Sequence, residues 1–225
     1  MKATPLLTGW TCRHLGDTAP GRPVTLPHDA MLAEPRTALS AGGVNTGWYE
    51  GYDYEYQRTL TVPENELSDT HILEFEGVYH NAEVWLNGQK AAFRPYGYTN
   101  FYVDCAPFLR AGDNELRVIA RNADQPNSRW YSGAGLYRPV QLWTAGDKHI
   151  LLNGVRIRTV SLEPAVVEIR VRTSAPGTVQ LMVEGLPTVR KESDGEAVFT
   201  NKVRYRIASV GVRSKKYCYN KKGEP

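Results

Sequence analysis

The sequence has few cysteines, no long apolar run and almost no helix signals. The three cysteines, Cys12, Cys105 and Cys218, are far apart and odd in number, which argues against a disulfide framework and favours a reducing compartment. No stretch approaches the roughly 18 apolar residues of a membrane-spanning helix. The start, Met1 to Pro5, lacks the apolar segment of a secretory signal. We therefore expect a cytoplasmic protein without a membrane partner.

Metal-binding and nucleic-acid-binding patterns are also weak. Cys12 and His14 have the spacing of half a zinc site, but no second closely spaced Cys/His pair follows, so we expect no metal and no cofactor. The net charge is +3, yet residues 201–225 hold eight basic side chains and one acidic one. The rest of the chain is mildly acidic. A solvated chain end explains this tail more simply than a nucleic-acid site, and we expect no nucleic-acid partner.

Short alternating and apolar runs, divided by glycine, proline, asparagine and aspartate, predict an all-β chain. Residues 54–62 alternate and end at Pro63. Asn87-Gly88 predicts a type I′ hairpin between strands over 82–86 and 89–93, with Trp85 in the core. Further strands are expected over 71–75, 115–121, 140–143, 150–152, 155–159, 166–173, 178–183 and within 198–212.

The run from Asn127 to Val140 concentrates aromatic side chains, two arginines, two glycines and an amide. A helix would not tolerate Gly133 and Gly135 so close together, and both indicate a tight turn with positive φ. Aromatic faces stack on the C–H face of a pyranose, and arginine and asparagine donate to its hydroxyls. This run therefore predicts contact with a carbohydrate.

Six segments occur in an order that resembles glycoside hydrolase family 2, the β-galactosidase and β-glucuronidase family. The resemblance covers nearly all of residues 8–145. The segments are Leu26-Pro27-His28-Asp29, the glycine-rich stretch 42–49, the strand 54–62, the block 75–88, the pair 97–101 and 112–118, and the run 127–140.

This resemblance implies an architecture of two β-sandwiches followed by a TIM barrel. Residues 1–145 are expected to form a jelly-roll, galactose-binding-domain-like sandwich that binds sugar. Residues 146–212 are expected to form a partial immunoglobulin-like sandwich, and 213–225 a disordered basic tail. A barrel needs about 250 residues. The C-terminal TIM-barrel domain is therefore expected to be missing from this chain.

The resemblance also implies where the chemistry lies. Retaining glycosidases use two carboxyl groups, and in this family both come from the barrel. We therefore expect no catalytic residue here, and a fragment that is inactive alone. The pairs Asn65-Glu66 and Asn114-Glu115 are interpreted as turn residues. His28-Asp29 is interpreted as a capping or hydrogen-bonding pair, because no nucleophile motif accompanies it.

In the family the first domain contacts the sugar, which implies candidate substrate-binding residues. These are Asn45, Asp53, Asn127, Arg129 and Trp130. Arg129 lies where several members carry a substrate-binding aspartate, so substrate contact and a structural ion pair both remain open. Trp130 and Tyr131 either stack on sugar or form a buried aromatic plug.

The functional hypothesis is an N-terminal fragment of a retaining, β-galactosidase-like glycoside hydrolase acting in carbohydrate metabolism. Its expected partners are a β-galactoside or related carbohydrate, the missing TIM-barrel domain, and further copies of itself in a homo-oligomer. The alternative is a freestanding, non-catalytic carbohydrate-binding or assembly module.

Overall fold

A computed structural model describes residues 1–184, 186–202 and 210–211. The chain divides into two compact units, of which one is Lys2–Thr144 and the other is formed almost entirely by the residues after Thr144. The expected disorder of residues 213–225 concerns a segment outside the described residues. The described part contains no α-helix, which confirms the all-β expectation.

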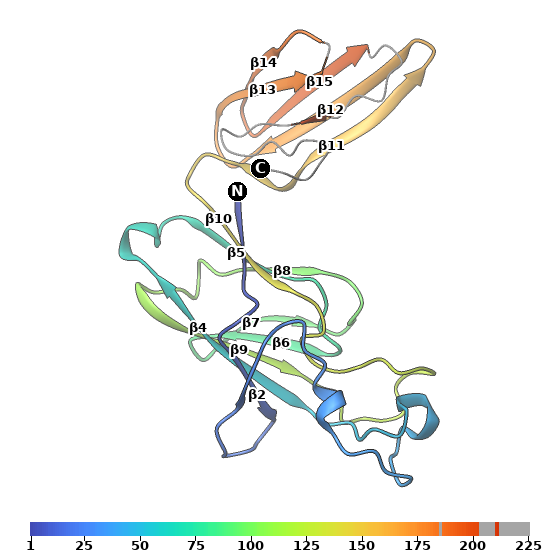
Figure 1. The fold of residues 1–225 in the computed structure, drawn as a ribbon. Helices are drawn as coiled ribbons and strands as arrows, with labels where there is room; N and C mark the ends of the chain where they lie inside the picture. Colours follow the sequence, from blue (N-terminus) through green and yellow to red (C-terminus); the bar gives the residue numbers. More distant parts are fainter. Residues whose placement is uncertain (185, 203–209, 212–225) are drawn as a thin grey trace. The chain divides into compact units, whose positions relative to one another are not determined.

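Two sheets build the first unit (Figure 1). The larger has six antiparallel strands in the order β3 (Arg22–Val24), β2 (Trp10–His14), β4 (Tyr54–Val62), β9 (Gly112–Ala120), β6 (Ala82–Leu86) and β7 (Gln89–Arg94). The smaller has four strands in the order β1 (Lys2–Pro5), β10 (Val140–Ala145), β5 (Thr70–Phe75) and β8 (Phe101–Asp104).

The alternation in the sequence sets which side chains enter the core. On β4, Tyr54, Tyr56, Leu60 and Val62 are all at most 5% exposed. Successive side chains of a strand point to opposite faces, so these residues share the face turned toward the second sheet. Core side chains of the two sheets form one cluster, and its largest fully buried members are Trp10, Tyr54, Tyr56, Phe75, Met31, Leu73, Leu86, Leu116 and Leu136.

The Asn87-Gly88 turn confirms the hairpin expected between β6 and β7. Both residues have positive φ, 49° and 77°, as a type I′ turn requires. Leu86 pairs with Gln89 across it. The Asn87 side chain also donates to Asn114, whose fully buried amide lies at the start of β9.

Trp85 was expected in the core, and this expectation is wrong. On β6 the buried apolar residues are Ala82, Val84 and Leu86, so Trp85 falls on the opposite, outer face with Glu83 and is only half-buried. Its ring lies between two cations, Lys90 at 5.8 Å and Arg117 at 5.0 Å from the ring centroid.

The outer face of the six-stranded sheet carries a row of ion pairs. Glu55, only 3% exposed, pairs with Arg13 on β2 and with Arg117 on β9. Farther along, Arg121 pairs with Asp53 at 3.1 Å and with Glu83 at 2.8 Å. Glu83 also binds Lys90 at 3.2 Å. Positive and negative groups thus alternate across neighbouring strands.

Three short 3-10 helices interrupt the loops of the first unit. They are η1 (Ala30–Ala33), η2 (Gly43–Thr46) and η3 (Glu64–Glu66). Asn65 and Glu66 lie in η3, whereas Asn114 and Glu115 lie within β9, so the interpretation of the second pair as turn residues is wrong. A search of the described residues found no helix long and apolar enough to cross a membrane.

Within its described residues, the second unit contains two three-stranded sheets around a separate core. One has the order β11 (Ile150–Leu162), β12 (Ala165–Thr173) and β15 (Glu196–Lys202). The other has β14 (Val189–Ser193), β13 (Gly177–Val183) and β16 (Val210–Gly211). β11 is one continuous strand where the sequence predicted two. The shared core holds Ile169, Val171, Val179, Leu181, Val183, Ala197 and Phe199.

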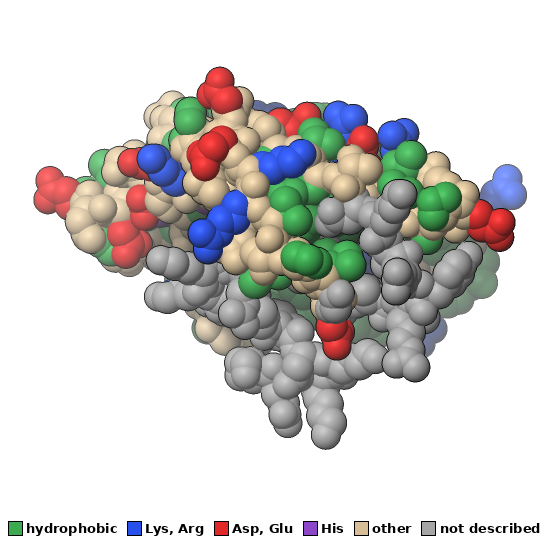
Figure 2. Space-filling view, turned by 90° about the horizontal axis from the view of Figure 1, so that it is seen from above, with side chains coloured by type: hydrophobic (Ala, Val, Ile, Leu, Met, Phe, Trp, Pro, Cys, Tyr) green, Lys and Arg blue, Asp and Glu red, His purple; other side chains and the backbone are tan. Residues whose placement is uncertain are grey.

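Acidic, basic and apolar side chains are mixed over the surface drawn in Figure 2. On the second unit Glu168 pairs with both Arg158 and Arg170. These charges lie on the outer face of β11 and β12, so the unit resembles an ordinary solvated sandwich on that side.

Candidate functional site

The stretch 42–49, called here the glycine-rich loop, is folded tightly around η2. Gly43 and Gly47 have φ of 51° and 63°, and Trp48 also has positive φ. The Thr46 hydroxyl donates to the Tyr49 carbonyl at 3.0 Å, which closes the loop on itself. Trp48 remains 40% exposed, and Asn45 is half-buried on η2.

Residues 127–138, called here the aromatic loop, turn at the two glycines that the sequence singled out. Gly133 and Gly135 have φ of 70° and 87°, which confirms the expected positive φ. Gly135 forms a pair of backbone hydrogen bonds with Tyr79, at 3.1 and 2.8 Å. A Cβ atom at Gly135 would collide with the hydroxyl of the fully buried Tyr56. Only glycine therefore fits this position.

Asp29 ties the aromatic loop to η1. Its Oδ1 accepts from the backbone N–H groups of Met31, at 3.1 Å, and Ala134, at 2.9 Å. Its Oδ2 accepts from the Tyr131 hydroxyl at 2.7 Å. The interpretation of Asp29 as a capping residue is confirmed, since it is the N-cap of η1. Burial, and then the Asp29 carboxylate, raise the pKa of Tyr131, so its hydroxyl keeps the proton that it donates.

The two loops meet through Tyr49 and Tyr131. Their ring centroids are 5.8 Å apart in a tilted arrangement. Tyr49 ends the glycine-rich loop, and Tyr131 is held by Asp29. The structure therefore joins three segments that are distant in the sequence, and Tyr49 was not among the residues expected at the site.

Trp130 is not a buried plug, because 60% of it is exposed. Its indole N–H donates to the Tyr98 hydroxyl at 3.2 Å. The ring lines a cavity of about 490 Å3, called here the Trp130 cavity. Its lining residues are Tyr79, His80, Pro95, Tyr96, Gly97, Tyr98, Asn127, Ser128, Arg129 and Trp130. The tyrosines that line this cavity with Trp130 were not predicted, although Tyr98 stands in one of the segments that carry the resemblance.

Arg129 lies on the rim of the Trp130 cavity with its side chain exposed. Within the described residues it makes no ion pair or hydrogen bond, so the structural ion pair weighed for it is absent there. The N–H groups of its guanidinium are therefore free to donate to solvent or to a ligand.

The side-chain amide of Asn127 is hydrogen-bonded to other groups of the protein. Its amide oxygen accepts from the Tyr79 hydroxyl at 3.1 Å. Its amide nitrogen lies within hydrogen-bond distance of Asn122 Oδ1, the Asp124 carbonyl and His80 Nε2. Asn127 therefore fixes the start of the aromatic loop.

Asp53 is similarly occupied. Its Oδ1 accepts from the backbone N–H groups of Asn122, at 2.9 Å, and Ala123, at 3.1 Å. Its Oδ2 pairs with Arg121. Asp53 holds the chain where it leaves β9, and it does not line the Trp130 cavity.

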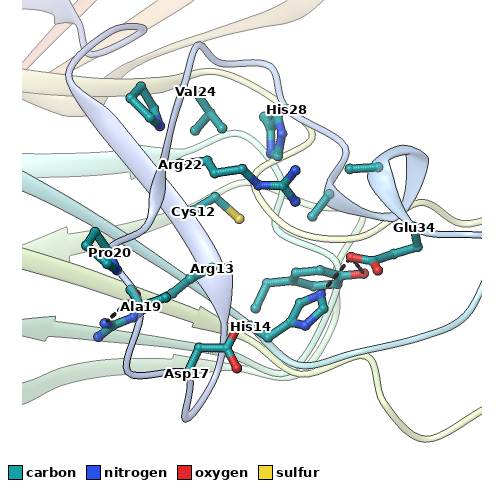
Figure 3. Close-up of a pocket in the computed structure, with 14 residues that line it drawn as sticks. Cys12, Arg13, His14, Asp17, Ala19, Pro20, Arg22, Val24, His28 and Glu34 are labelled. Carbon is teal, nitrogen blue, oxygen red and sulfur yellow. Dashed lines mark hydrogen bonds and ion pairs between the residues drawn. The ribbon is translucent and has the colours of Figure 1, made fainter.

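A second cavity, of about 450 Å3, lies between β2, β3 and η1 (Figure 3). On one side His14 Nε2 lies 2.7 Å from Glu34 Oε1, and the Tyr54 hydroxyl donates to the same oxygen at 3.4 Å. The partner of His14 is thus a carboxylate. Burial raises the pKa of the nearby Cys12 thiol to about 11. No group of three or more potential metal ligands occurs in the described residues.

Comparison with known proteins gives the family of this chain. A family described as glycosyl hydrolase 2 galactose-binding domain-like matches residues 23–161. The β-galactosidase BoGH2A of Bacteroides ovatus is 37% identical over 161 residues, which are 67% of this chain and 19% of that protein.

Solved structures show the same fold. A β-glycosidase from Bacteroides vulgatus superimposes with a TM-score of 0.76 at 25% identity, over 90% of this chain and 29% of that one. A glycosyl hydrolase family 2 member from Bacteroides cellulosilyticus gives 0.73 at 25% identity, over 89% and 30%. The chain thus spans less than a third of each of these relatives. With its galactose-binding-like sandwich, this chain belongs to glycoside hydrolase family 2 and corresponds to the N-terminal region of those enzymes.

Proposed function

We propose that the aromatic loop, with Trp48 and Tyr49 of the glycine-rich loop, forms one side of a pyranose site in a retaining glycosidase of the β-galactosidase type. The observation that carries this proposal is the position of Trp130, which is 60% exposed beside a cavity of about 490 Å3. Exposed apolar side chains grouped beside a cavity mark a binding site, and the 57% exposed Tyr96 lines the same cavity. The C–H face of a sugar is a suitable partner for the Trp130 ring.

Hydrogen-bond donors next to the ring support a polyhydroxylated ligand. Arg129 lines the same cavity, and its guanidinium is free of other partners in the described part of the chain. Asn45 lies on η2 in the glycine-rich loop, the loop that Tyr49 links to the aromatic loop. We assign Arg129 and Asn45 to direct contact with sugar hydroxyls, and Asn127 and Asp53 to holding the loops in place.

We further propose that residues 1–225 do not hydrolyse glycosides themselves. Neither Asn-Glu pair lines the Trp130 cavity. The Asn114 amide is fully buried and donates to the Arg110 carbonyl at 2.8 Å. Glu66 ends η3 on the surface. Two carboxyl groups facing one sugar are what retention requires, and neither pair offers them.

Calorimetric titration of the purified chain with galactose, lactose and glucuronate tests the proposal. We expect millimolar binding, because one side of a pocket makes few of the contacts, and at least a threefold loss in Trp130→Ala. Phe93→Ala is the matched control, since Phe93 is 54% exposed and lies outside the Trp130 cavity. Equal affinity in wild type and Trp130→Ala would contradict the proposal.

Two further readouts separate the alternatives. Micromolar affinity would favour a freestanding binding module over part of a larger pocket. Turnover of a chromogenic β-galactoside or β-glucuronide, abolished by a substitution within residues 1–225, would contradict the proposed lack of hydrolysis.

A further inference from the structure

The second cavity, called here the Arg22 pocket, contains a guanidinium without a partner. Arg22 lies on β3 directly opposite Cys12 on β2. Figure 3 shows its guanidinium directed into the pocket, beside His28 and across from Glu34. In the described residues no hydrogen bond or ion pair reaches Arg22.

The other basic side chains of the pocket are already engaged. Arg13 pairs with Glu55, and His14 lies against Glu34. The remaining acid, Asp17, lies at the lower edge of the view in Figure 3, away from the guanidinium. Arg22 is therefore the one uncompensated cation among the described lining residues.

His28 adds a neutral hydrogen-bonding group beside Arg22. Its Nδ1 lies 2.8 Å from the Tyr56 hydroxyl, which leaves Nε2 available on the ring. Burial lowers the pKa of His28, so the ring is uncharged near neutral pH. The Tyr56 hydroxyl lies within hydrogen-bond distance of both Nδ1 and the His28 carbonyl, so Nε2 is a donor in one tautomer and an acceptor in the other.

Glu34 supplies a hydrogen-bond acceptor on the side of the pocket across from Arg22. Its side chain is 8% exposed, and Oε1 receives both His14 and Tyr54. A carboxylate has about four lone-pair sites, so acceptor capacity remains after these two bonds. The pocket thus offers donors at one end and an acceptor at the other.

We propose that the Arg22 pocket binds a small hydroxylated carboxylate, with the carboxylate on Arg22 and hydroxyl groups on His28 and Glu34. Guanidinium and carboxylate form paired, parallel hydrogen bonds. The volume of about 450 Å3 lies in the range of small-molecule sites. This site is separate from the Trp130 cavity, since the two share no lining residue.

Titration with sodium D-gluconate tests the proposal, with D-glucitol as the neutral comparison of the same length. We expect gluconate to bind at least tenfold more tightly than glucitol, and Arg22→Gln to lower gluconate affinity about tenfold. Arg22→Lys should give an intermediate loss, because lysine keeps the charge without the fork. Since Arg22 has no internal partner among the described residues, its variants should melt at the wild-type temperature.

Arg190→Gln is the matched control, because Arg190 is an exposed strand arginine outside the pocket and its loss changes the net charge equally. Equal binding of gluconate and glucitol, full affinity in Arg22→Gln, or an equal loss in Arg190→Gln would each overturn the proposal. Arg22→Gln should keep wild-type affinity for galactose, which distinguishes failure here from failure of the pyranose site.

Discussion

Replacing Asp29 by alanine should loosen the aromatic loop and lower the stability of the first unit. The substitution removes the N-cap of η1 and leaves the buried N–H groups of Met31 and Ala134 without an acceptor. A lost cap costs about 1 kcal/mol, and a buried unpaired N–H about 1–3 kcal/mol. We expect the free energy of unfolding to fall by about 2–3 kcal/mol. Asp29→Asn, which keeps the oxygen acceptor, should lose less than about 1 kcal/mol.

Urea unfolding followed by tryptophan fluorescence measures this loss selectively. All five tryptophans lie between Lys2 and Thr144, so the signal reports the first unit. With a slope of about 2 kcal/mol per molar urea, the midpoint should fall by about 1–1.5 M.

Asp104→Ala is the control for the Asp29 variants. Asp104 is exposed and accepts a single local hydrogen bond, from the Ala106 N–H at 3.1 Å. Its loss should cost at most about 0.5 kcal/mol. If Asp29→Ala and Asp104→Ala unfold at the same urea concentration, Asp29 does not tie the loops together as described.

Three other substitutions test the fold. Gly135→Ala should cost about 1–3 kcal/mol more than Gly112→Ala, because both have positive φ but only the Cβ at 135 meets a buried tyrosine; equal urea midpoints would contradict this. Asn114→Ala should lower stability by at least about 2 kcal/mol, whereas Asn65→Ala, exposed on η3, should have almost no effect in the same assay. Burial raises the pKa of Cys105 from 9.0 to about 12, so the folded state holds that proton more tightly than the unfolded state. The stability that this proton contributes is complete below pH 9.0 and is lost as the pH rises toward about 12. In a series of urea unfolding measurements over this pH range, the free energy of unfolding should therefore decline less steeply in Cys105→Ala than in the wild type.

The longer strands and the Asn87-Gly88 turn were predicted from the sequence, because both depend on local patterns, whereas the short strands β1, β2, β3, β8 and β14 were not. The strand at 54–62 coincides with β4, and Asn87-Gly88 forms the expected turn. The prediction for Trp85 was wrong, because the alternation along a strand does not show which of its two faces the second sheet covers. The Trp85 ring packs against Lys90 and Arg117 on the outer face of the sheet and not against core side chains.

The site was predictable only in part. The aromatic loop was identified from composition, yet its anchor on Asp29 joins residues about a hundred positions apart and leaves no periodic signal. The roles of Asn127 and Asp53 depend on partners that only the folded chain brings near. The Arg22 pocket was not predicted for the same reason, because the spacing of Arg22, His28 and Glu34 in the sequence matches no known motif.

The alternating ions on the outer face of the six-stranded sheet limit how this chain can associate with others. The pairs Glu55–Arg117 and Glu83–Arg121 link neighbouring strands, with partly exposed arginines and largely buried carboxylates. A second protein seated over them would have to remove the hydration of the arginine side chains, and the stronger attraction within the existing pairs seldom repays that cost. We therefore expect the outer face of the six-stranded sheet to remain hydrated in a complex, and neighbouring subunits or domains to bind other surfaces of this unit.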